Sequence, residues 1–294
     1  TIGIPFLGGI PYWVQSEMTG RIRPIVSEEQ RSGAAEAYRA LRTNVLAALE
    51  KAGKRLVMMT SADSKEGKTL TSLNLAIMIS KAGKKVLLLD MDLRRGVLHK
   101  SLEMERFPGL TDVLLGKIGL GEVIHPTSFE NLWFAAAGTT ERNTSELLHI
   151  NDMNAFFNHP ALAPYDYVVM DTAPILRATD TVVLAAVPGC TVVYVAHSNR
   201  TPKPMIRYSL DMLGEAHVLG LIVNSIEMHK ISSLYYTYQY PNYAYYSYAY
   251  AYGYDYYLYD GQGRRTGREH HKKSWSLIRQ RMASWWHRNV MPPG

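Results

Sequence analysis

Short runs of apolar residues alternate along the chain with longer helix-like segments, and this alternation restricts the possible folds more than any other feature. The runs that are typical of strands are 55–61 (RLVMMTS), 84–90 (KKVLLLD), 131–137 (NLWFAAA), 165–171 (YDYVVMD), 190–196 (CTVVYVA) and 218–224 (VLGLIVN). Their apolar residues are continuous rather than alternating, which indicates strands that are buried on both faces. The sequence therefore predicts an α/β fold in which helices flank a mostly parallel sheet.

The chain divides into four segments by composition. We predict a juxtamembrane linker with little regular structure at 1–27, a domain at 28–227, a tyrosine cluster at 228–260 and a basic amphipathic tail at 261–294. With 294 residues and 47% apolar content, the chain can bury one large core and still carry extensions. The single cysteine is consistent with a reducing compartment, no apolar run approaches the length of a membrane span, and the first residues suggest a piece of a longer protein.

The first predicted strand leads directly into ADSKEGKT, residues 62–69, and a predicted helix follows at 69–83. This is the pattern of a phosphate-binding loop, with Ala62 in place of the usual leading glycine. Backbone N–H groups and the positive end of the helix dipole can bind phosphates there. Lys68 is expected to reach the β- and γ-phosphates and Thr69 to bind Mg²⁺. The residues expected to contact ATP are Ala62, Asp63, Ser64, Lys65, Glu66, Gly67, Lys68, Thr69 and Leu70.

The alternative is a turn that contains Gly-Lys-Thr by chance, which the strand-loop-helix setting disfavours. Lys65 occupies a position that is often glycine in such loops, so the loop is expected to wrap the nucleotide differently.

Aspartates end two later predicted strands, in LLLDMDLRR and VVMDTAP. In open α/β sheets this carboxyl edge is where ligands bind. Asp171 fits a Mg²⁺ ligand. Asp90 and Asp92 can share the remaining work, one holding metal and the other accepting a proton, and Asp90 is the preferred base. Strand-end aspartates can also simply cap a turn, and for Asp92 this alternative stays open.

The chain is identified as resembling the bacterial tyrosine kinases (BY-kinases) of capsule and exopolysaccharide export. The motifs that carry the resemblance are TSADSKEGKT, LLLDMDLRR, GLTDVLLG, NTSELL and YDYVVMDTAP, followed by a tyrosine cluster. The resemblance covers about 28–260, and Gly96 departs from it because the family often has proline there. It implies an ATP- and Mg²⁺-dependent protein-tyrosine kinase that phosphorylates its own tail, with catalytic Lys68, Asp90 and Asp92 and with metal ligands Thr69, Asp90 and Asp171.

The same resemblance implies partners and a location. Glu36, Arg39 and Arg42, in EAYRALR, match a family motif at the contact between protomers of a ring-like homo-oligomer. Taken alone, their spacing is typical of a solvated helical face with internal ion pairs. The other implied partners are a transmembrane co-polymerase segment of the same or another chain and a protein-tyrosine phosphatase. The implied location is the cytoplasmic face of the bacterial inner membrane.

Of the 20 tyrosines, 14 lie between Tyr235 and Tyr259, in a segment with too few aliphatic residues to form its own core. The resemblance implies that these are the phosphoacceptors: Tyr235, Tyr236, Tyr238, Tyr240, Tyr243, Tyr245, Tyr246, Tyr248, Tyr250, Tyr252, Tyr254, Tyr256, Tyr257 and Tyr259. An aromatic platform for single-stranded nucleic acid would need interleaved basic residues, and the segment has none. We therefore expect no nucleic-acid partner.

The main alternative function is a membrane-associated switch ATPase of the septum-site or partition type with a tail that is not a substrate. Those relatives carry an additional lysine early in the loop, where this chain has Asp63. The sequence therefore favours the kinase.

The basic character of the chain belongs to its last segment. The net charge is +6, but residues 261–294 carry eight Lys and Arg against Glu269 alone, so the remainder is near neutral. The apolar residues of this segment share one helical face, namely Trp275, Ile278, Met282, Trp285 and Trp286. This pattern predicts binding either to an anionic membrane surface or to the kinase core or a neighbouring copy.

Overall fold

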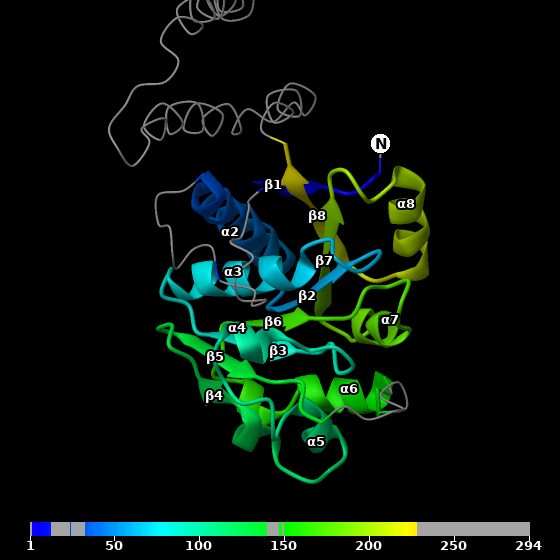
Figure 1. Ribbon diagram of the computed structural model, residues 1–294. Coiled ribbons are helices and arrows are strands. Elements are labelled where there is room, and N and C mark those ends of the chain that lie inside the picture. Colours follow the sequence, from blue (N-terminus) through cyan, green and yellow to red (C-terminus); the bar gives the residue numbers. More distant parts are fainter. Residues whose placement is uncertain (1, 13–23, 25–32, 140–146, 149, 228–294) are drawn as a thin grey trace, which may run out of the picture. The chain divides into compact units, whose positions relative to one another are not determined.

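The structure is a computed structural model that describes residues 2–12, 24, 33–139, 147, 148 and 150–227 (Figure 1). Its centre is a sheet of eight strands in the order β1-β8-β7-β2-β6-β3-β5-β4. In chain order the strands are β1 (Phe6–Pro11), β2 (Leu56–Ser61), β3 (Val86–Asp90), β4 (His125–Pro126), β5 (Leu132–Ala135), β6 (Tyr167–Asp171), β7 (Cys190–His197) and β8 (Val218–Ile226). Every neighbouring pair is parallel except β4 with β5.

The predicted parallel sheet is confirmed, and all six predicted strands are present. The central strands β2, β3 and β6 are buried along their whole length, as their continuous apolar runs predict. Strand β4 was not predicted, because it is only two residues long and exposed. No described helix combines the length and the apolar character that a membrane crossing requires.

Residues 1–27 differ from the prediction of a linker with little regular structure, because Phe6–Pro11 form β1 at the edge of the sheet. The strand pairs in parallel with β8, and the Leu221 amide donates to the Pro5 carbonyl at 2.8 Å. Its two glycines interrupt the apolar run that would otherwise predict a strand. A Cβ atom on Gly9 would lie 2.4 Å from Ile226 Cδ1, so the backbone of β1 closely approaches the end of the Ile226 side chain.

The helices cover both faces of the sheet. They are α2 (Gly33–Ala52), α3 (Lys68–Ser80), α4 (Leu98–Ser101), α5 (Leu110–Leu114), α6 (Ile150–Phe157), α7 (Asp180–Ala185) and α8 (Lys203–Met212), with 3₁₀ turns at Leu120–Val123 and Pro160–Leu162. Figure 1 shows α2 and α3 side by side, and α3 also contacts β3 and β6. On the other face, Met58 of β2 belongs to one apolar cluster with Phe156, Leu184 and Ile206 of α6, α7 and α8.

Candidate active site

The loop Ala62–Gly67 connects β2 to α3, as the motif predicts, and its backbone has positive φ at two positions. Lys65 has φ 64° and Gly67 has φ 89°. A Cβ atom on Gly67 would lie 1.9 Å from Asn224 Nδ2, so both the backbone angle and the space require glycine there. Lys65 adopts the left-handed conformation at some energetic cost, which explains why glycine suits this position.

The buried side chain of Glu66 pins the loop from inside. Its carboxylate accepts hydrogen bonds from the Asp63 amide at 3.0 Å and from the Thr201 hydroxyl, and its carbonyl accepts one from Asn224 Nδ2 at 3.0 Å. Burial raises the pKa of Glu66. Thr201 follows β7, and Asn224 lies in β8. The position of the loop is therefore fixed by residues from two later strands of the sheet. Nothing in the sequence around Thr201 and Asn224 predicts this role.

Lys68 and Asp171 form a buried ion pair at the base of the loop. Lys68 Nζ lies 2.6 Å from Asp171 Oδ1, and both side chains are almost fully buried. Ser72 Oγ, one turn further along α3, donates to the same carboxylate oxygen at 2.9 Å. Lys68 Nζ also lies 3.3 Å from Thr69 Oγ1. The structure thus brings together three predicted site residues, and it adds Ser72, which the sequence did not predict.

Asp90 is fully buried beside this pair. The ends of β3 and β6 are in register, so Asp90 lies opposite Asp171. Asp90 Oδ2 accepts the Leu98 amide at 3.1 Å, whereas Oδ1 has no hydrogen-bond partner among the described residues. Burial, and then the charge of Asp171, raise the pKa of Asp90 well above its usual value. Asp90 has an unsatisfied carboxylate oxygen and faces the Asp171 carboxylate, and Lys68 Nζ contacts both Asp171 and the Thr69 hydroxyl. Carboxylate and hydroxyl oxygens are donors that Mg²⁺ takes, so these residues fit the ion.

Asp92 lies two residues beyond the strand, in a half-buried position. Its Oδ1 accepts the Arg95 amide at 3.0 Å. Burial raises the pKa of Asp92, and the charge of Lys68 opposes that effect. Gly96 allows the following loop to close over the site, because a Cβ atom there would lie 2.7 Å from Asp90 Oδ2. Of the paired aspartates, only Asp92 is partly exposed to solvent.

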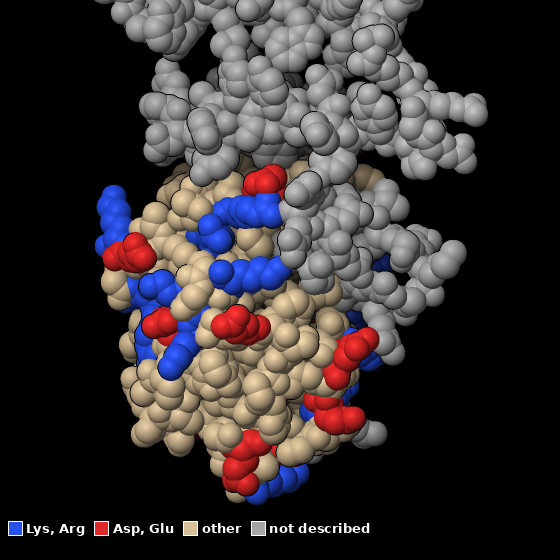
Figure 2. All heavy atoms as spheres, turned by 90° about the vertical axis from the view of Figure 1, so that its left-hand side faces the viewer, with Lys and Arg blue, Asp and Glu red and all other residues tan. Residues whose placement is uncertain are grey.

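Glu36, Arg39 and Arg42 lie on α2, outside the group of residues at the phosphate loop. Glu36 and Arg39 form an ion pair within the helix, and Arg42 is half-buried. The intrahelical pair is what the spacing alone predicts, and the contact between protomers stays a prediction. On the face shown in Figure 2, Lys and Arg side chains are interspersed with Asp and Glu rather than gathered in one basic patch. All the predicted phosphoacceptors and the basic tail lie outside the described residues.

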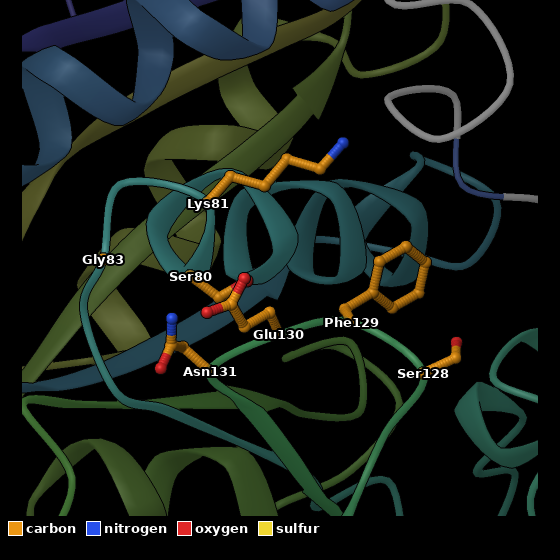
Figure 3. A pocket seen from close by; sticks show the side chains of 7 residues that line it. All are labelled: Ser80, Lys81, Gly83, Ser128, Phe129, Glu130 and Asn131. Atoms are coloured by element: carbon orange, nitrogen blue, oxygen red, sulfur yellow. The ribbon is translucent and has the colours of Figure 1, made fainter.

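A cavity of about 450 Å³ lies at the far end of α3 (Figure 3). It is lined by Ser80, Lys81, Gly83, Ser128, Phe129, Glu130 and Asn131. These residues lie at the end of α3 and just before β5, so the cavity belongs to the amino edge of the parallel strands, opposite the phosphate loop. The loop at the start of α3 is the better candidate site, because ligands of such sheets bind at the carboxyl edge.

Comparisons with known proteins agree with this geometry. A family model described as an AAA domain matches residues 43–197. The tyrosine-protein kinase YwqD of Bacillus subtilis is 34% identical over 214 residues, which are 72% of this chain and 90% of that protein. The tyrosine-protein kinase wzc of Salmonella typhi is 34% identical over 212 residues, 70% of this chain but 29% of that protein.

Among solved structures, the kinase domain of the Escherichia coli tyrosine kinase ETK matches with a TM-score of 0.69 and 30% identity, covering 77% of this chain and 92% of that one. The chain spans only 26% to 29% of the length of several curated relatives, wzc included.

Proposed function

Because the chain belongs to the bacterial tyrosine kinases, we propose that it transfers the terminal phosphoryl group of ATP to tyrosines of its own 235–259 cluster. The observation that best supports this proposal is the convergence of Lys68, Asp171 and the unsatisfied Asp90 beside the phosphate loop. Phosphoryl transfer depends mainly on positioning and on charge stabilisation, and this cluster supplies both.

The residues of the loop are proposed to share the binding work. The amides of residues 62–70 bind the phosphates at the start of α3, where the helix dipole is positive. Lys68 exchanges its Asp171 partner for the β- and γ-phosphates. Thr69, Asp90 and Asp171 would hold Mg²⁺, and the bound ion would supply positive charge next to the phosphate oxygens.

For the proton, the geometry favours Asp92 over the sequence-based preference for Asp90. Asp90 is fully enclosed, whereas Asp92 is partly exposed and can be reached by an incoming phenol. In the transfer, the phenol oxygen forms a bond to the terminal phosphorus and the bond from that phosphorus to the bridging oxygen breaks. The phenol proton passes to a carboxylate oxygen of Asp92, and ADP leaves.

The wider setting is also proposed from the family. We expect a ring-like homo-oligomer in which Glu36, Arg39 and Arg42 contact the next protomer and the tail of one copy enters its neighbour's site. We also expect a transmembrane co-polymerase segment, a protein-tyrosine phosphatase and a role in exopolysaccharide or capsule synthesis and export at the cytoplasmic face of the inner membrane. The tyrosine cluster at 228–260 and the basic tail at 261–294 remain part of this proposal, whereas β1 (Phe6–Pro11) belongs to the sheet of the domain rather than to a linker.

The test is to incubate the chain with ATP and Mg²⁺ together with a mass-tagged Lys68→Met copy and to map phosphates by mass spectrometry. Phosphotyrosine between Tyr235 and Tyr259 on the inactive copy is the expected result, and it would establish transfer between subunits. Phosphate on the active copy alone would contradict transfer between subunits. Release of inorganic phosphate without phosphotyrosine on either copy would favour the switch ATPase instead.

A further inference from the structure

Arg177 forms a two-point ion pair with the second residue of the phosphate loop. Its Nε lies 2.6 Å from Asp63 Oδ1, and its Nη2 lies 3.0 Å from Asp63 Oδ2. Such fork-to-carboxylate geometry is also the geometry with which arginine binds phosphate. Arg177 follows β6, the strand that ends in Asp171, and is a basic side chain held beside the loop without being part of the motif.

The backbone around Arg177 is anchored to the loop, so the proximity does not depend on the ion pair alone. The amides of Ile175 and Leu176 donate to the carbonyls of Ser61 and Ala62, at 2.9 and 3.1 Å. At the other end of the same segment, Asp180 is 3.4 Å from Arg94 Nε and buried. Because both ends are tied down, the guanidinium can exchange partners by side-chain rotation, without movement of the backbone.

The Asp63 carboxylate accepts hydrogen bonds from groups that could also donate to a phosphate. Besides Arg177, it accepts the Ser64 amide of the loop at 2.6 Å. The hydrogen bonds from Arg177 and then from Ser64 lower the pKa of Asp63, so it is ionised at neutral pH. The negative charge of Asp63 repels an incoming polyphosphate unless a cation balances one of the two. Arg177 balances Asp63 in this structure, and it could balance the phosphate instead.

We propose that Arg177 is a nucleotide-sensing residue whose guanidinium moves from Asp63 to the terminal phosphate of a bound nucleoside triphosphate. A terminal phosphate carries more negative charge than a carboxylate and offers more acceptor oxygens to the same fork. Arg177 then acts as a second cation beside Lys68 and makes the site prefer triphosphate over diphosphate. This inference rests on the proposed function, since it needs a nucleotide in the loop.

The test compares the affinities for ATP and ADP, each with Mg²⁺, by calorimetry on the full chain, with ATP supplied as an analogue whose imido bridge prevents transfer of the terminal phosphoryl group. Arg177→Ala is expected to weaken ATP about tenfold or more and ADP much less, because the lost contact is to the terminal phosphate. Arg177→Lys keeps the charge but not the two-point geometry of the guanidinium, so its ATP affinity is expected to lie between those of the wild type and Arg177→Ala. Asp63→Ala is expected to strengthen ATP binding. Arg207→Ala, an exposed arginine on α8, serves as the matched control and leaves both affinities unchanged.

The double variant Asp63→Ala/Arg177→Ala separates this role from simple neutralisation of Asp63. If Arg177 moves to the phosphate, the double variant keeps the low ATP-to-ADP preference of Arg177→Ala. Return of the double variant to the wild-type preference, or an equal loss of ATP and ADP in Arg177→Ala, would overturn the inference while the kinase proposal stands. Wild-type chain that bound neither nucleotide would overturn both.

Discussion

The two ends of α3 differ in the charged side chains that they bury. The start of the helix adjoins the phosphate loop, and its end adjoins the cavity. At its start, Lys68, Asp90 and Asp171 are enclosed together, and one oxygen of Asp90 has no hydrogen-bond partner among the described residues. At its end, the 450 Å³ cavity is lined by side chains such as those of Lys81 and Glu130, which are exposed. Burying a charged group without a full set of partners costs stability. A cluster of such groups at one edge of the sheet therefore indicates a functional site more strongly than the volume of a cavity does.

The two ends also differ in their glycines. Gly67 before α3 and Gly83 after it both have positive φ, 89° and 81°. Gly67 is packed against Asn224, whereas a Cβ atom on Gly83 would have no atom within 4 Å. The start of the helix therefore requires both a positive φ and space for Asn224, whereas the end requires only the positive φ. Matched substitutions at the two ends of α3 test whether this difference affects activity and stability.

The largest expected effect comes from Lys68→Met. Tail phosphorylation is expected to fall at least about 100-fold, because the variant lacks the cation that balances the transferring phosphoryl group. Removing one partner of a buried ion pair also costs stability, on the order of 3–5 kcal/mol, so urea unfolding must be measured alongside activity. Lys81→Met at the other end of α3 is the control. A comparable loss of phosphorylation in Lys81→Met would contradict the comparison.

Alanine at the two glycines is expected to separate packing from backbone strain. Gly83→Ala should cost about 1–2 kcal/mol of stability, the cost of a left-handed alanine, and leave nucleotide binding intact. Gly67→Ala has the same strain and in addition displaces Asn224, so both stability and ATP affinity should fall further. The measurements are chemical denaturation and ATP titration. Equal stability and equal ATP affinity in the two variants would show that Asn224 does not constrain the loop.

Asp90→Asn tests the cost of the buried carboxylate, measured without metal or nucleotide. The folded-state pKa of Asp90 is raised, so its contribution to stability is fully present below the unfolded pKa and is lost as pH rises through the folded value. Asparagine does not ionise, so the variant should melt a few degrees higher than wild type at neutral pH, with the difference vanishing near pH 4. A variant that melts lower at pH 7 and unchanged at pH 4 would argue against an ionisation cost.

The smallest effect is expected at the amino edge. Phe129→Ala removes the largest side chain lining the cavity of Figure 3. Since this side chain is far from the loop, phosphorylation of the tail should change less than about twofold, within the range of surface substitutions. The readout is the initial rate of phosphotyrosine formation. A tenfold loss in a variant of unchanged stability would make the cavity part of the active site.

Motifs that are continuous in the sequence predict the fold and the part of the site formed by the phosphate loop and the strand-end aspartates. The strand, loop and helix around Lys68 follow one another directly, and strand-end aspartates such as Asp171 must meet at one edge of a parallel sheet. Residues brought in by tertiary topology could not be predicted in this way. Thr201, Asn224 and Arg177 reach the loop from later strands, and their local sequences resemble ordinary loops and strand ends. Strand β1 was not predicted because it contains Gly8, which lies against Leu41 of α2, and Gly9, which lies against Ile226 of β8, in place of a continuous apolar run.

The proposed phosphoryl transfer can be followed with the γ-phosphoryl group of labelled ATP. Purified chain is supplied with Mg²⁺ and γ-labelled ATP, and label is counted in peptides that cover 235–259 and in free phosphate. We expect label to accumulate on the tyrosines, in step with ADP formation, in wild type and not in Asp92→Asn. ADP formation with all label in free phosphate, or equal tyrosine labelling in Asp92→Asn, would contradict the account.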